Sequence, residues 1–203
     1  MIFITGEHGS GKTHFARLYQ ARFGYDFIDL GPTLRNIWSA GSPEMSFGDF
    51  ISEGENRLGK RFADNLLVQE IERRLLDNHD SEIKRDLLLI GSRSIDGINY
   101  LRENITVDNG RPKRIVYIEA SERILYERYK KREGFDISLQ DFKNILDKDR
   151  KMGVLSIRPY ADWVIRNEGR IDDFESKCVD IQTSLESDSS SKEGQRSRGK
   201  ERS

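Results

Sequence analysis

Short apolar runs alternate with longer amphipathic stretches along residues 1–185. Short runs bounded by polar or glycine residues are typical of strands that are buried on both faces, and apolar residues at helical spacing are typical of amphipathic helices. This alternation favours an α/β domain around a mainly parallel sheet. The predicted strands are Met1–Thr5, Tyr25–Leu30, Asp86–Gly91, Arg114–Ala120 and Asp162–Asn167.

The stretches between these runs predict helices. The predicted helices are Lys12–Phe23, a short one near Thr33–Ser39, a long one over Asn56–Asp77, the pair Ser121–Arg132 and Ser138–Met152, and a closing helix over Ile171–Leu185. The polar, glycine-containing stretch Gly41–Gly54 predicts a loop or a mobile flap. Residues 186–203 contain no aromatic or aliphatic side chain, so we expect a disordered polar tail after a single domain over residues 1–185.

Composition narrows the class of protein. A formal net charge of −1 gives no overall field that would attract nucleic acid or an anionic membrane. Cys178 is the only cysteine, which excludes an intramolecular disulfide and a cysteine-rich metal site. With no stretch of about 18 apolar residues and no secretory leader pattern, we expect a cytoplasmic protein without a membrane span.

The first predicted strand is followed by GEHGSGKT, which fits G-x-x-x-x-G-K-[ST] at every fixed position. Its glycines permit backbone conformations in which amide hydrogens point at phosphate oxygens, and the following helix adds its positive end. We therefore predict a phosphate cradle for ATP, with the lysine on the β/γ-phosphates and the threonine hydroxyl on Mg²⁺. We interpret the histidine as a loop residue rather than a catalytic base. The predicted cradle residues are Gly6, Glu7, His8, Gly9, Ser10, Gly11, Lys12 and Thr13.

Many proteins use such a cradle, and the rest of the chain favours a small-molecule kinase. The guanine-reading N-K-x-D of GTPases is absent from the sequence, and a motor or large ATPase would need a longer chain. Helices that carry arginines suit phosphoryl transfer to a metabolite, because the moving group needs cations around it.

Four later stretches stand in order behind the cradle: LGPTLR (Leu30–Arg35), GSRS (Gly91–Ser94), ERILYERYKKR (residues 122–132) and ADWVIRNEG (Ala161–Gly169). Together with the cradle they make residues 1–185 resemble the nucleoside monophosphate kinase-like P-loop fold. The sequence looks most like dephospho-CoA kinases and related archaeal P-loop kinase-like proteins. The resemblance implies a three-layer α/β/α domain with a five-stranded parallel sheet of order 2-3-1-4-5.

The resemblance also implies roles for residues outside the cradle. Arg35 and Arg93 would hold an anionic acceptor, and Arg128 with Arg132, four apart on one helix face, would close over the transferring phosphate as lid arginines. Asn167 would lie beside the nucleotide base.

Two positions depart from the family pattern. Ile90 stands where the archaeal relatives have an acid at the end of the third strand, and Pro32 replaces an aspartate in the acceptor segment. Asp29 matches the first acid of the D-x-D in dephospho-CoA kinases. It is the candidate for orienting the metal or activating the acceptor oxygen, and the alternative is a surface acid beside a turn.

The leading hypothesis is an ATP-dependent phosphotransferase whose acceptor is a nucleoside or deoxynucleoside monophosphate, or dephospho-CoA. The alternative is an ATP-binding regulatory or assembly module with weak or no kinase activity, which Ile90 and the polar tail favour. Phosphorylation of nucleic-acid 5′ ends lacks support, because no basic stretch interleaved with aromatic residues is present.

Overall fold

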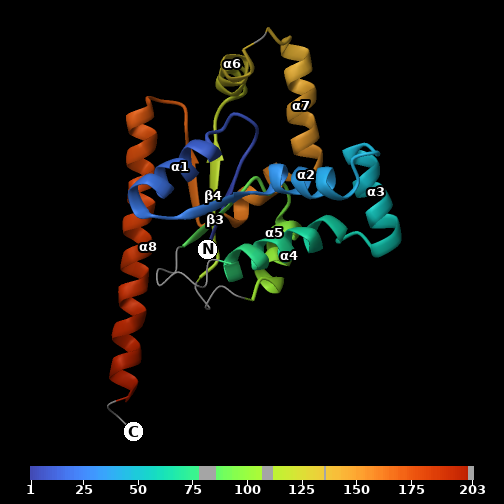
Figure 1. The fold of residues 1–203 in the computed structure, drawn as a ribbon. Helices are drawn as coiled ribbons and strands as arrows, with labels where there is room; N and C mark the ends of the chain where they lie inside the picture. The colour runs from blue at the N-terminus through green and yellow to red at the C-terminus, as the bar shows by residue number, and fades with distance from the viewer. Residues whose placement is uncertain (78–85, 107–111, 135, 201–203) are drawn as a thin grey trace.

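The computed structural model describes the backbone of residues 1–77, 86–106, 112–134 and 136–200 (Figure 1). Its five strands are β1 (Ile2–Thr5), β2 (Asp26–Asp29), β3 (Leu87–Ile90), β4 (Arg114–Glu119) and β5 (Trp163–Arg166). The helices are α1 (Lys12–Phe23), α2 (Leu30–Gly41), α3 (Phe47–Leu58), α4 (Phe62–Asp77), α5 (Ile95–Asn104), α6 (Glu122–Glu133), α7 (Leu139–Lys151), the 3-10 helix η2 (Val154–Tyr160) and α8 (Ile171–Lys200).

The strands form one parallel sheet of order β2-β3-β1-β4-β5, which confirms the predicted fold class and strand order. All residues of β1 and β3 are buried, as expected for central strands covered on both faces. The cradle loop therefore leaves the sheet at the carboxyl end of the central strand. Open α/β sheets bind their ligands at this edge.

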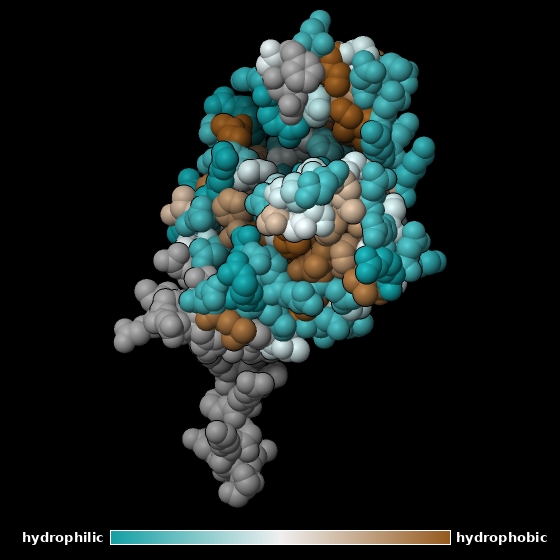
Figure 2. All heavy atoms as spheres, turned by 45° about the vertical axis from the view of Figure 1, so that its right-hand side comes forward, coloured by the Kyte–Doolittle hydropathy of each residue, from teal (hydrophilic) through white to brown (hydrophobic). Residues whose placement is uncertain are grey.

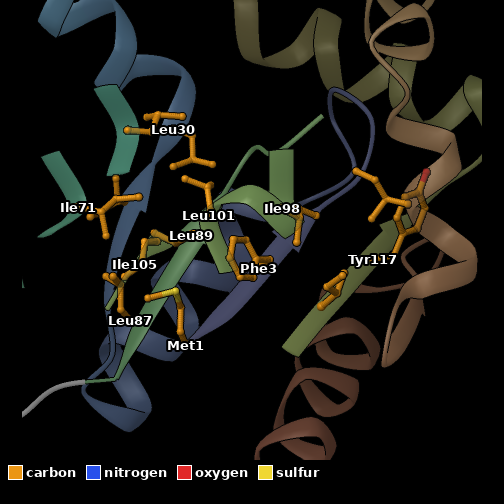
Figure 3. Close-up of a cluster of buried hydrophobic side chains, with 14 of the residues drawn as sticks. Met1, Phe3, Leu30, Ile71, Leu87, Leu89, Ile98, Leu101, Ile105 and Tyr117 are labelled. Atoms are coloured by element: carbon orange, nitrogen blue, oxygen red, sulfur yellow. The ribbon is translucent and has the colours of Figure 1, made fainter. Parts of the chain in front are cut away.

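Two apolar clusters cover the two faces of the sheet. Side chains alternate along β1, so Phe3 faces one cluster while Ile2 and Ile4 face the other. The Phe3 cluster packs the sheet against α2, α4, α5 and η2 (Figure 3). The second cluster packs it against α1 and α8, where Phe15, Tyr19, Phe174 and Cys178 are buried. This is the three-layer arrangement that the resemblance implied.

A third, smaller cluster holds α6 and α7 together at the top of the molecule in Figure 1. Its buried members are Leu125 on α6 and Phe142 and Leu146 on α7. This cluster is separate from the clusters on the two sheet faces, so the α6–α7 pair has an apolar contact of its own beyond the carboxyl edge of the sheet.

The region after α2 differs from the prediction. Gly41–Gly54 was predicted as a loop or flap, but α3 begins at Phe47. The Ser46 hydroxyl caps this helix by accepting a hydrogen bond from the backbone amide of Asp49. Ser46-Phe-Gly-Asp49 carries this N-cap signal, which the glycine content obscured. The prediction of loop or flap is therefore wrong for the second half of this stretch.

The predicted continuous helix Asn56–Asp77 is also wrong, because the chain breaks at Gly59, where φ is +95°. A Cβ on Gly54 would lie 2.2 Å from the Phe62 ring, so a glycine is required for α3 to pack this closely on α4. The sequence prediction also missed two elements, α5 and η2. The Ser94 hydroxyl caps α5 through the amide of Gly97.

Helix α8 begins at Ile171 as predicted and continues through Lys200. Side chains are described as far as Ser187, and residues 201–203 lie outside the described residues. The expectation of a disordered tail over residues 186–203 stays a prediction, as does the domain boundary at residue 185. In the described part of the chain, every helix is too short or too polar to span a bilayer.

Candidate functional site

The cradle loop depends on glycines with positive φ. Gly6, Gly9 and Gly11 have φ values of 138°, 80° and 110°. A Cβ on Gly6 would lie 2.1 Å from the carbonyl oxygen of Ile118, so the loop passes directly against β4. These values are closed to most side chains, which is why the spacing of the glycines identified the loop from sequence.

Helix α1 begins at Lys12 without a side-chain cap and without an acid in its first turn. The first amides of a helix have no intrahelical acceptor, and the helix dipole makes this end positive. An anion such as a phosphate would accept hydrogen bonds from these amides and would be attracted by the positive end of the dipole. This end of α1 therefore fits the predicted triphosphate.

A cavity of about 530 Å³ opens above the loop and continues toward α2 and the α6–α7 pair. Figure 2 shows a hollow with a mostly polar surround below the part of the molecule where Figure 1 places α6 and α7. The wall of the cavity includes most of the predicted site residues: Gly6, His8, Gly9, Gly11, Lys12, Thr13, Asp29, Arg35, Arg93, Arg128 and Arg132. The structure thus brings the cradle and all four predicted arginines to one space.

Lys12 folds back over the loop. Its ammonium donates to the carbonyl oxygens of Gly6 and Glu7, each 2.8 Å away. Burial lowers the pKa of Lys12 to about 8, and the nearby carboxylates of Asp149 and Asp29 limit the shift. A phosphate would take the place of these carbonyl contacts and restore the preference for the charged form.

Asp149, on α7, is a cavity residue that the sequence prediction missed. Its Oδ2 lies 2.5 Å from Nδ1 of His8 and 3.3 Å from the His8 backbone nitrogen, and its Oδ1 lies 3.2 Å from Nη1 of Arg93. Burial raises the pKa of this carboxyl, but the hydrogen bond and charge of His8, with Arg93 and Lys12, lower it below its usual value overall.

A signal for Asp149 was present in the sequence. Phe142, Leu146 and Asp149 follow one another at helical spacing, and all three are buried. An aspartate on the core-facing side of an amphipathic helix is expensive to bury unless it is paired, so such a position indicates a specific partner.

A second contact ties α7 to the loop. Nε of Arg150 donates to Glu7 at 2.7 Å, and Nη2 reaches Glu122 of α6 at 3.3 Å. Glu7 and His8, two of the four variable positions of the loop motif, are therefore held by two consecutive residues of α7. Glu7 itself does not line the cavity, and His8 is a loop residue, as predicted, whose backbone nitrogen faces Asp149.

Asp29 is the last residue of β2 and lines the cavity. Burial raises its pKa, while a hydrogen bond from the Gly31 backbone and the charges of Lys12 and Arg35 act in the other direction. Arg35 lies on α2, with its guanidinium 5.4 Å from the Phe47 ring centre. The short segment Asp29–Arg35 thus contributes one acid and one cation to the cavity.

The lid arginines differ in their surroundings. Arg128 donates through Nη2 to Oδ1 of Asn167 at 3.0 Å, and its buried Nη1 has no hydrogen-bond partner. Arg132 lies over the Tyr129 ring at 5.0 Å. Arg128 lines the cavity, and an anionic ligand there would offer an acceptor to its buried Nη1.

Asn167 is almost fully buried beneath the loop, where it donates to the Ser10 carbonyl at 2.8 Å. Neither Asn167 nor Ser10 lines the cavity. In this structure Asn167 supports the loop and Arg128, and its predicted position beside the nucleotide base stays a prediction.

The donor set available for a metal ion is small. The described residues contain no group of three or more His, Cys, Asp or Glu side chains placed to hold one. Thr13 and Asp29 both line the cavity, and a hydroxyl and a carboxylate are oxygen ligands that suit a Mg²⁺ whose other ligands are phosphate oxygens and water.

No family model matches the chain. UPF0200 proteins of Saccharolobus islandicus and Saccharolobus solfataricus are 25% identical over 185 residues, covering 89% of this chain and 91% of each relative. A UPF0200 protein of Sulfurisphaera tokodaii is 24% identical over 187 residues, covering 89% and 94%.

Similar solved structures include P-loop kinases. A gluconokinase from Sinorhizobium meliloti aligns with a TM-score of 0.55 and 18% identity, over 87% of each chain. A shikimate kinase from Acinetobacter baumannii, in complex with shikimate, aligns with a TM-score of 0.56 and 20% identity, over 90% of this chain and 92% of that one. At these identities the similarity shows the fold alone, and the chain has the fold of P-loop kinases.

Proposed function

We propose that this protein is an ATP-dependent phosphotransferase that acts on a nucleotide-like small molecule: a nucleoside or deoxynucleoside monophosphate, or dephospho-CoA. The observation that carries the proposal is the shared cavity, in which Lys12 and four arginines from three parts of the chain face one space beside the cradle. The names of the similar kinases, a gluconokinase and a shikimate kinase, support a small-molecule acceptor.

The cradle would bind the triphosphate through the amides of Gly6–Thr13 and the ammonium of Lys12. Mg²⁺ would be held by the Thr13 hydroxyl and oriented by Asp29, and it would neutralise charge on the phosphates. The cavity wall also contains the carboxylates of Asp29 and Asp149, which would repel a triphosphate, so its lysine and arginines would supply the attraction that binds the nucleotide.

Arg35 and Arg93 would hold the acceptor on the far side of Lys12. Arg128 and Arg132, on α6, would contact the transferring phosphoryl group and exclude water, because an open site would hydrolyse ATP instead of transferring its phosphate. The acceptor oxygen forms a bond to the γ-phosphorus, the bond from that phosphorus to the β–γ bridging oxygen breaks, and ADP leaves with the electron pair.

A second candidate is an ATP-binding regulatory or assembly module. The observation that favours it is Ile90, which is 1% exposed at the end of β3 and leaves that strand without an acid. Such a module would use the same cradle and the same α7 contacts, but it would not turn over an acceptor.

One experiment separates the two candidates. The protein is incubated with Mg²⁺, labelled ATP and, in turn, nucleoside monophosphates, deoxynucleoside monophosphates and dephospho-CoA. A labelled acceptor product supports the phosphotransferase. Tight ATP binding without a labelled product from any acceptor contradicts it and supports the module.

A further inference from the structure

Asp149 occupies an unusual place for a carboxylate. It is 2% exposed, and it is the only charged residue among the buried residues that the structure describes. It comes from α7, yet it contacts the cradle through His8 and the acceptor side through Arg93. It thus stands between the group that would hold the triphosphate and a group that would hold the acceptor.

The two oxygens of this carboxylate have different surroundings. Oδ2 is held by the ring and the backbone nitrogen of His8. Oδ1 is buried and has no hydrogen-bond donor, although Arg93 lies 3.2 Å away as an ion-pair partner. A buried carboxylate oxygen that lacks a donor is costly, and a ligand that supplies a donor would remove this cost.

We propose that Oδ1 of Asp149 accepts the hydrogen bond of an acceptor hydroxyl, which makes Asp149 a catalytic residue and the acceptor an anionic alcohol rather than a phosphate. This inference rests on the proposed phosphotransferase activity and narrows its substrate class. The anionic group of the acceptor would bind to the guanidinium of Arg35 or Arg93, and the acceptor hydroxyl would point to Asp149.

Charge favours an alcohol over a phosphate at this position. Two negative charges in close contact repel each other more strongly in a partly buried site than in water. A phosphate acceptor would place its attacking oxygen against Asp149, and it would also compete with Asp149 for Arg93. A neutral hydroxyl avoids this repulsion and supplies the missing donor.

The step balances without another reactant. The hydroxyl oxygen forms a bond to the γ-phosphorus of ATP, and the bond to the β–γ bridging oxygen breaks, with the electron pair leaving on ADP. The hydroxyl proton passes to Oδ1 of Asp149 and then to water. His8 is hydrogen-bonded to Oδ2 and leaves Oδ1 without that contact.

The nature of the product tests the substrate class. Phosphorus NMR of reactions with dephospho-CoA, gluconate, shikimate and nucleoside monophosphates distinguishes a new phosphate ester from a new phosphoanhydride. We expect esters only. A phosphoanhydride from a monophosphate would overturn this inference and leave the phosphotransferase intact, whereas no product from any acceptor would overturn both.

A variant tests the residue. Asp149→Asn keeps the shape of the side chain but weakens it as a proton acceptor, so we expect kcat for the alcohol to fall by about 100-fold or more while the Kd for ATP changes little. Asp147→Asn is the matched control, because this residue is two positions away on α7 and exposed outside the cavity. Full turnover by a folded Asp149→Asn protein would overturn the role. If this variant does not fold, the product analysis of the unmodified protein still decides the substrate class.

Discussion

The side-chain amide of Asn167 donates a hydrogen bond to the carbonyl oxygen of Ser10, 2.8 Å away, and joins the exit of β5 to the cradle loop. The other end of the same amide accepts from Arg128. A Cβ on Gly11 would lie 2.5 Å from Nδ2 of Asn167, so the loop fits directly over this side chain. One buried amide therefore sets the position of both the loop and a lid arginine.

We predict that Asn167→Ala weakens both folding and ATP binding. The change leaves the Ser10 carbonyl without its donor in a buried place, which should lower the free energy of unfolding by about 1–3 kcal/mol. Chemical denaturation and calorimetric ATP titration measure the two effects. Asn144→Ala, which removes an exposed amide on α7 that accepts a hydrogen bond from Gln140, is the control and should change neither. Normal ATP affinity in a destabilised Asn167→Ala protein would show that the amide does not set the loop.

Arg128→Ala should lower turnover more than ATP affinity. Nη1 of Arg128 is a buried donor with no partner, and we expect it to contact the phosphoryl group in transfer. Steady-state kinetics and ATP titration separate the effects on kcat and Kd. Arg123→Ala, on the same helix but outside the cavity, is the comparison. A loss of ATP affinity in Arg128→Ala without any change in kcat would count against the lid role.

The lowered pKa of Lys12 predicts proton uptake when ATP binds. With a pKa of about 8, this amine is partly neutral at pH 8.5 in the nucleotide-free protein, and the triphosphate raises its pKa. Binding at pH 8.5 should therefore take up a proton, while binding at pH 7, where Lys12 is already charged, should take up less. Calorimetry in buffers of different ionisation enthalpy measures the uptake. Equal uptake at the two pH values would contradict the assignment.

Gly6→Ala should destabilise the protein far more than Gly24→Ala. Both glycines have positive φ, but only Gly6 would bring its Cβ to 2.1 Å from a backbone carbonyl, whereas Gly24 faces open space. Gly24→Ala should cost only the conformational strain of a side chain at positive φ, about 1 kcal/mol. Gly6→Ala adds a steric clash with a backbone oxygen, which only a shift of the backbone can relieve. Thermal unfolding of the two variants gives the comparison, and similar losses would mean that the loop moves freely away from β4.

The predictable parts of the structure are those that local patterns determine. The strands and α1 follow from short apolar runs and from the glycine spacing of the loop, because these signals lie within a few residues. The strand order came from the family resemblance. Helix α3 was missed because its glycines suggested a loop, and the break at Gly59 was missed because the apolar spacing continues across it.

The site was predictable as far as its motifs reach. Most of the cradle residues and the four arginines line one cavity, and their roles in binding and transfer stay predictions. Asp149 was not predicted, because its importance depends on α7 folding over His8, more than 140 positions away in the sequence. Asn167 was predicted, but its contact with Ser10 depends on how β5 ends beside the loop. Contacts between distant segments of this kind have no local signature.

Transfer of labelled phosphate from ATP, compared between the unmodified protein and Lys12→Ala, tests the proposed phosphotransferase most directly. Lys12→Ala removes the cation that would face the β/γ-phosphates while leaving the loop glycines in place. We predict a labelled acceptor with the unmodified protein and none with the variant, at equal protein concentration and with both proteins folded. Near-normal transfer by Lys12→Ala would contradict the proposed function.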